Sequence, residues 1–196
     1  MTDAALSQDS VAKKAVFPRM VEVHKPLMAA YQAAPERAWV TDHAQTIGVV
    51  DPRDPLRGRV ALGPGREGQL DIALHTAVGG DSALPVPGDL LAAALATCLD
   101  STVRVVANRF QIELTELRVA VDAEVDVRGT LMVDPKVPVG FQRMQVRLHL
   151  RAAPGTNARK LELLPQVAEH CCVVLQTLRA AVDISVHVDV GEAPAS

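Results

Sequence analysis

The residues of this chain with the clearest chemical potential are its three cysteines, Cys98, Cys171 and Cys172. Three is an odd number, and the chain begins without a recognisable secretory signal, so these thiols do not form a disulfide scaffold. They are therefore either buried core residues or redox groups. A reactive cysteine must be a thiolate, and a thiolate needs a nearby cation or the positive end of a helix.

Cys98 lies near the middle of a predicted helix that opens at Gly88-Asp89 and runs to about Asn108. One face of this helix carries Leu91, Leu95, Cys98, Thr102 and Val106, at steps of three and four residues. Residues 90–98 carry no charge, so we expect most of the helix circumference to be buried, with Cys98 facing inward. A helix interior does not stabilise a thiolate, so a cation would have to reach Cys98 from elsewhere.

Cys172 lies close to the start of the last predicted helical segment, residues 172–181. Free N–H groups at such a start would favour its anion. The preceding helix is expected to begin after Asn157 as N-cap and to be interrupted at Pro165. Residues 184–190 alternate apolar and polar side chains and are expected to close the fold as a strand.

Strand-like patterns occupy residues 38–50, 58–62, 69–76, 117–127 and 144–150. Residues 7–34 form a predicted helical arm with interruptions at Pro18 and Pro26. Strands and helices come in blocks with hairpin-like links, which favours an α+β fold with antiparallel sheets over a doubly wound sheet. We expect an N-terminal helical arm with extra strands over residues 1–56 and a main domain over residues 57–196.

Composition excludes several classes of protein. The chain has 196 residues, of which 48% are hydrophobic and 22% charged, a balance typical of a folded protein. A net charge of −3 gives no support to nucleic-acid binding. The longest apolar run, residues 90–99, is too short for a membrane helix, and the N-terminus has no apolar signal region. For these reasons we expect a cytoplasmic protein. The histidines lack ligand spacing and no C-x-x-C occurs, so we expect no bound metal.

Three segments together resemble the OsmC/Ohr family of osmotically inducible and organic hydroperoxide resistance proteins. Residues 87–98, PGDLLAAALATC, are similar to its P-x-[ED]-L-x-x-A-A-x-x-x-C signature. Residues 168–178, AEHCCVVLQTL, look like its second cysteine block, and residues 65–68, GREG, resemble its G-R-[ED]-G turn. The resemblance covers roughly residues 57–190, in family order. It implies an OsmC-like fold, with antiparallel sheets wrapped around long central helices in an intertwined homodimer.

The resemblance also implies a thiol peroxidase that reduces organic hydroperoxides without a bound cofactor. By this carry-over Cys98 is the peroxidatic thiolate and Cys172 resolves its sulfenic acid as a disulfide. Arg66 supplies the cation that Cys98 needs, and Asp89 either holds Arg66 or only caps the helix. An external dithiol reductant, such as a lipoylated protein, would then regenerate the two thiols.

Two departures from the family pattern keep a second interpretation open. The organic-hydroperoxide branch has a glutamate where this chain has Gly88, and a proline where it has Val173. A catalytically weak OsmC-like stress-associated or small-molecule-binding protein is therefore the alternative. The choice between Cys171 and Cys172 as the resolving thiol is open at this point, and family register favours Cys172.

Overall fold

The computed structural model describes residues 19–47, 53–63, 68–180 and 182–190. The chain divides into two compact units, residues 1–39 and residues 40–196. In the first unit, helix α1 (Met20–Ala33) is followed by the short 3-10 helix η1 (Pro35–Ala38). The predicted interruption at Pro26 is wrong, because α1 continues through it and loses only the hydrogen bond that proline cannot donate. Pro18 lies outside the described residues.

The second unit opens with a three-stranded antiparallel sheet in the order β1-β2-β3. Its strands are β1 (Ala44–Thr46), β2 (Arg57–Leu62) and β3 (Gln69–Ala73). The strand predicted to reach residue 76 ends at Ala73, and the 3-10 helix η2 (Thr76–Val78) follows. This helix forms because the His75 ring accepts a hydrogen bond of 2.9 Å from the N–H of Ala77, which caps the turn.

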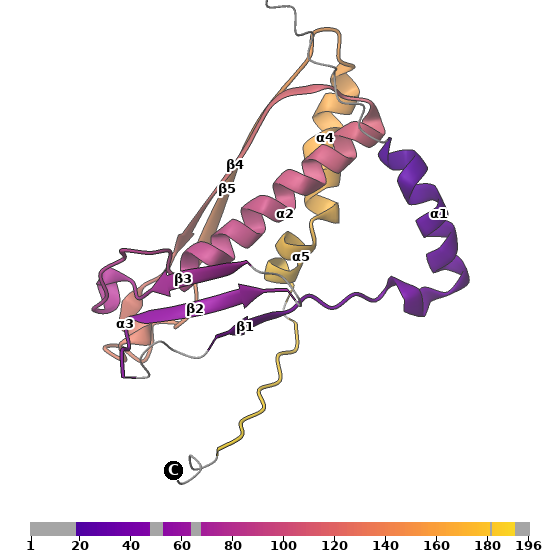
Figure 1. Cartoon of the computed structure of the whole chain (residues 1–196). Coiled ribbons are helices and arrows are strands. Elements are labelled where there is room, and N and C mark those ends of the chain that lie inside the picture. The colour runs from indigo at the N-terminus through magenta and orange to yellow at the C-terminus, as the bar shows by residue number, and fades with distance from the viewer. Residues whose placement is uncertain (1–18, 48–52, 64–67, 181, 191–196) are drawn as a thin grey trace, which may run out of the picture. The chain divides into compact units, whose positions relative to one another are not determined.

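Helix α2 (Pro87–Phe110) is the central element (Figure 1). It contacts strand β4 (Leu114–Glu124) and helices α4 (Ala158–Cys171) and α5 (Val173–Arg179). Its fully buried positions are Leu95, Leu99, Val103, Val106 and Ala107. The expectation that most of its circumference is buried is wrong for a single chain, because Ala93, Ala94 and Thr97 are exposed. Cys98 therefore lies at the border of the core and is half-buried.

By length and composition alone, α2 qualifies as a membrane-spanning helix. The core helix of a folded domain passes the same test. In this structure Leu95, Leu99 and Val103 are 1%, 2% and 0% exposed and join the core with residues of other helices. Core packing therefore accounts for the apolar residues on the buried face of α2.

The second sheet is the antiparallel hairpin of β4 (Leu114–Glu124) and β5 (Arg143–Ala152). Its inner face packs apolar side chains against the core, and its outer face carries cross-strand ion pairs such as Arg147–Asp122. The expected extension of the first strand to Val127 is wrong. The Asp126 carboxylate accepts a 3.0 Å hydrogen bond from the Arg128 N–H and starts the one-turn helix α3 (Val127–Thr130).

Helices α4 (Ala158–Cys171) and α5 (Val173–Arg179) follow the hairpin. The predicted N-cap is confirmed, since the Lys160 N–H donates to the Asn157 side chain at 3.0 Å. The predicted interruption at Pro165 is wrong. Leu164 and Ala168 on either side of it are both 0% exposed, and this burial outweighs the one hydrogen bond that the proline lacks.

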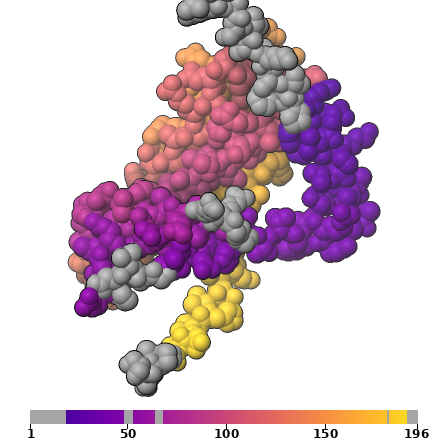
Figure 2. Space-filling model, viewed as in Figure 1, coloured from indigo at the N-terminus to yellow at the C-terminus, as the bar shows by residue number. Residues whose placement is uncertain are grey.

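The C-terminal segment 182–190 is extended and forms no strand pairing with any other described part of the chain. Its apolar side chains alternate and are largely exposed: Ile184 82%, Val186 79%, Val188 77% and Val190 87%. Figure 2 shows this yellow segment extending from the second unit. The predicted closing strand therefore has the alternation of a strand but lacks a partner within the described chain.

Candidate active site

Two thiols from separate helices meet in the core of the second unit. Cys98 comes from the middle of α2, and Cys172 lies at the junction between α4 and α5. The Cys98 thiol lies close enough to the Cys172 thiol to influence its pKa, and both thiols are free. Cys172 is 0% exposed, whereas Cys98 is half-buried. The structure thus brings together the two cysteines that the sequence analysis had paired.

The position of Cys172 follows from a break in the helix. Its backbone dihedrals, φ −78° and ψ 107°, are extended, so α4 ends before it and α5 begins after it. This break directs Cys172 into the core among Leu164, Ala168 and Leu175. Cys171, the last residue of α4, is exposed instead. The junction therefore separates the adjacent thiols into one buried and one accessible group.

Burial is the largest influence on Cys172 and raises the pKa of its thiol above the ordinary value. The backbone N–H groups of Leu175 and Val174 at the start of α5 act in the opposite direction, while the nearby Cys98 thiol raises the pKa further. The expectation that the helix start favours the Cys172 anion is therefore wrong in its net effect. A raised pKa suits a thiol that follows rather than begins a nucleophilic sequence.

This assignment predicts a measurable titration. In a Cys98→Ser/Cys171→Ser variant, the thiolate absorbance of Cys172 should have its midpoint above that of free cysteine, because burial remains. The Cys171→Ser variant retains Cys98, so the thiolate that forms first should oppose ionisation of the second thiol. The higher of its two midpoints should therefore exceed the Cys172 midpoint of the double variant. Ultraviolet absorbance against pH checks both. A Cys172 midpoint at or below that of free cysteine would contradict the desolvated environment.

Asp89 serves the start of its own helix. Its Oδ2 accepts a 2.9 Å hydrogen bond from the Val86 N–H, closing the first turn of α2 behind Pro87. At a rise of about 1.5 Å per residue, Asp89 and Cys98 are about 14 Å apart along the helix axis. The structure thus does not bring Asp89 to the Cys98 thiol of the same chain. Arg66, the predicted cation, lies outside the described residues.

Gly88, at the glutamate position of the hydroperoxide branch, lies beside an aromatic ring. A Cβ atom at Gly88 would lie 3.1 Å from Cζ of Phe141, a residue of the loop before β5. A glutamate at this position would therefore require the Phe141 ring to move. The sequence carries no local signal for this contact, because Gly88 and Phe141 belong to distant segments.

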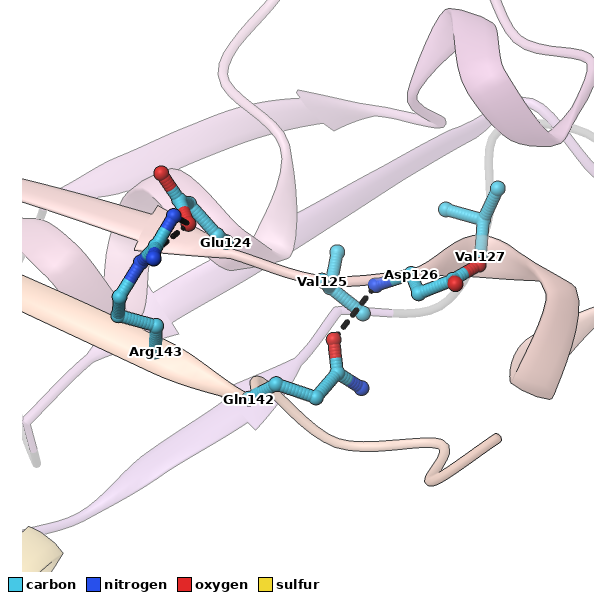
Figure 3. Close-up of a pocket in the computed structure, with 6 residues that line it drawn as sticks. All are labelled: Glu124, Val125, Asp126, Val127, Gln142 and Arg143. Carbon is cyan, nitrogen blue, oxygen red and sulfur yellow. Dashed lines mark hydrogen bonds and ion pairs between the residues drawn. The ribbon is translucent and has the colours of Figure 1, made fainter. Parts of the chain in front are cut away.

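An open hollow of about 690 Å³ lies where β4 ends and β5 begins (Figure 3). It is lined by Glu124, Val125, Asp126, Val127, Gln142 and Arg143. Gln142 Oε1 accepts a 2.7 Å hydrogen bond from the Asp126 N–H, and Arg143 pairs with Glu124 across the strands. None of the cysteines lines this hollow, so it is separate from the thiol pair.

Comparison with known proteins shows which family the chain belongs to. A model of the OsmC-like protein family matches residues 79–187, more than half of the chain, including Cys98 and Cys172. The crystal structure of an organic hydroperoxide resistance protein OsmC from Legionella pneumophila is 27% identical, with a TM-score of 0.53 over 74% of this chain and 94% of that one. No curated protein sequence matches the chain.

Two more distant structures show the same fold. An organic hydroperoxide resistance protein from Elizabethkingia anophelis is 20% identical, with a TM-score of 0.53 over 74% of this chain and 92% of that one. An OsmC-like protein from Mycoplasma pneumoniae is 12% identical, with a TM-score of 0.56 over 72% and 89%. The α+β class with antiparallel sheets is confirmed, and the chain belongs to the OsmC-like protein family.

Proposed function

We propose that this protein is a thiol peroxidase that reduces organic hydroperoxides in the cytoplasm, with Cys98 as peroxidatic and Cys172 as resolving cysteine. The observation that carries the proposal is the meeting of these two thiols from α2 and the α4–α5 junction. The organic hydroperoxide resistance protein of Legionella pneumophila, at 27% identity, supports the substrate class.

The proposed reaction begins at the half-buried thiol. The Cys98 thiolate attacks the distal oxygen of the hydroperoxide, the O–O bond breaks, and the alcohol leaves after taking up a proton. Cys98 is then a sulfenic acid. The Cys172 thiol attacks its sulfur, water leaves, and a Cys98–Cys172 disulfide forms. An external dithiol, such as that of a lipoylated protein, reduces the disulfide and is itself oxidised.

In this proposal Arg66 stabilises the Cys98 thiolate and polarises the peroxide, as the resemblance implies. Asp89 caps α2 in its own chain, and its distance from Cys98 means that any contact with a Cys98 thiol requires a second copy. A homodimer is part of the proposal for this reason. The exposed, alternating segment 182–190 supports it, because an unpaired strand of this kind gains hydrogen bonds and burial from another chain.

One observation favours a second candidate function. A Cβ atom at Gly88 would lie 3.1 Å from the Phe141 ring, a tight contact for the glutamate of the hydroperoxide branch. A protein that retains the fold and the thiols but lacks this carboxylate would be a small-molecule-binding member of the family with weak catalysis. It would bind hydroperoxide analogues without losing thiols to a hydroperoxide.

The deciding experiment is an anaerobic thiol titration before and after a stoichiometric pulse of cumene or tert-butyl hydroperoxide. We expect two thiols per chain to disappear within seconds, with peptide mapping that finds a Cys98–Cys172 link. Hydrogen peroxide at the same concentration is the control for substrate class. Persistence of all three thiols over minutes would refute the peroxidase and favour the binding protein.

A further inference from the structure

Two side chains of α5 reach back to a single residue of α4 across the cysteine junction. The Gln176 side-chain amide donates a 2.7 Å hydrogen bond to the backbone carbonyl of Glu169. The Arg179 guanidinium pairs with the Glu169 carboxylate at 3.0 Å. We call Glu169, Gln176 and Arg179 the junction clamp.

The junction clamp spans the point where the helical backbone is broken. Cys172 has extended dihedrals, so no continuous helix fixes the direction of α5 relative to α4. Glu169 lies in the last turn of α4, where carbonyl groups lack partners within their own helix. Gln176 satisfies one of these carbonyls from the far side of the break. The clamp thereby supplies a connection that the backbone itself does not provide.

This connection affects how closely the sulfur atoms of Cys98 and Cys172 can approach each other. A disulfide requires the two Cβ atoms to lie about 3.8 Å apart with a restricted torsion, a narrower requirement than contact between thiols. Cys98 is held in the middle of α2, whereas Cys172 lies at the break. Leu175 anchors α5 on the buried side, and the junction clamp ties it on the exposed side.

We infer that Glu169, Gln176 and Arg179 are positioning residues that hold Cys172 in register for disulfide formation with Cys98. The inference rests on the proposed Cys98–Cys172 disulfide and adds to it the residues that set its equilibrium. None of the three touches a reacting atom. Their effect is on the effective concentration of one thiol at the other.

The test is the equilibrium between the full-length protein and a buffer of reduced and oxidised dithiothreitol, which needs no hydroperoxide. All proteins carry Cys171→Ser, so that Cys98 and Cys172 are the only thiols. In this exchange the protein loses two electrons and two protons to form the disulfide, and oxidised dithiothreitol gains them. Gln176→Glu removes the amide donor at nearly constant size and places a second carboxylate beside Glu169. Arg179→Ala removes the cation.

We expect the combined Gln176→Glu/Arg179→Ala change to lower the equilibrium constant for the disulfide about tenfold, the scale of one hydrogen bond and one exposed ion pair. Arg179→Lys retains the cation and should stay near the starting protein. Arg147→Ala is the matched control, because it removes an exposed ion pair with Asp122 on the outer face of the hairpin. Circular dichroism verifies that each variant is folded.

The outcomes of this experiment distinguish the positioning role of the junction clamp from the proposed peroxidase activity. Equal constants for the clamp variant, the control and the starting protein would overturn the positioning role while leaving the peroxidase intact. A tenfold loss in the clamp variant alone would support the positioning role even if the protein ignored hydroperoxides, which would refute only the peroxidase. Failure of the starting protein to form any Cys98–Cys172 disulfide, both in this buffer and after a hydroperoxide pulse without reductant, would overturn both.

Discussion

Replacing Cys98 with serine is expected to reduce hydroperoxide consumption by about three orders of magnitude or more, the scale at which loss of a nucleophile suppresses turnover in other enzymes. A serine hydroxyl at this site has no accessible anion at neutral pH, so it cannot attack the O–O bond. Its size is close to that of cysteine, and Cys98 lies at the border of the core rather than inside it. The fold of α2 should therefore persist.

The measurement is the loss of cumene hydroperoxide with time in the presence of a dithiol reductant. Cys171→Ser is the matched control, since it removes an exposed thiol at the junction without altering Cys98 or Cys172. Cys171→Ser should retain the rate of the unaltered protein. Equal rates for Cys98→Ser and the unaltered protein would remove Cys98 from the mechanism and end the assignment.

Replacing Cys172 with serine should limit the protein to one turnover when no reductant is present. Cys98 still attacks the hydroperoxide, but the buried thiol that lies beside it is gone, so its sulfenic acid has no resolving partner. After a stoichiometric pulse we expect one equivalent of hydroperoxide to be consumed per chain. Dimedone should then label Cys98, as mass spectrometry of the peptide would reveal.

The unaltered protein is the comparison for this variant, and it should give a Cys98–Cys172 disulfide and no dimedone adduct. A Cys172→Ser protein that instead forms a Cys98–Cys171 disulfide as fast as the unaltered protein forms its own would transfer the resolving role to Cys171. That outcome would require the exposed thiol to turn inward at the junction. Its current exposure argues for the buried Cys172.

Much of the fold was predictable from local pattern. The uncharged run after Gly88-Asp89 indicated α2, Asn157 indicated the start of α4, and strict alternation indicated both strands of the hairpin. These features depend on residues that are near one another in the chain, where periodicity and capping act. The two cysteine blocks and the GREG turn, in their order along the chain, were sufficient to indicate the family.

Proline positions show where local pattern failed. Pro26 and Pro165 indicated helix breaks, yet α1 and α4 continue through them. The actual break falls at Cys172, where the last helical segment was predicted to begin, although cysteine is not a helix-breaking residue. In α4 the burial of Leu164 and Ala168 decides the outcome, and burial depends on what α2 presents to that helix. Helix continuity here is therefore a consequence of packing.

The sequence by itself determined the family, most of the helices and strands, and which two cysteines were candidates for the site. Only the tertiary structure decided that burial raises the pKa of Cys172, that the junction clamp spans its helix break and that segment 182–190 has no partner in the described chain. Phe141 reaches Gly88 for the same reason. Periodicity and capping act over a few residues, whereas desolvation, cross-helix hydrogen bonds and strand pairing join atoms that are distant in sequence and meet only after the chain has folded.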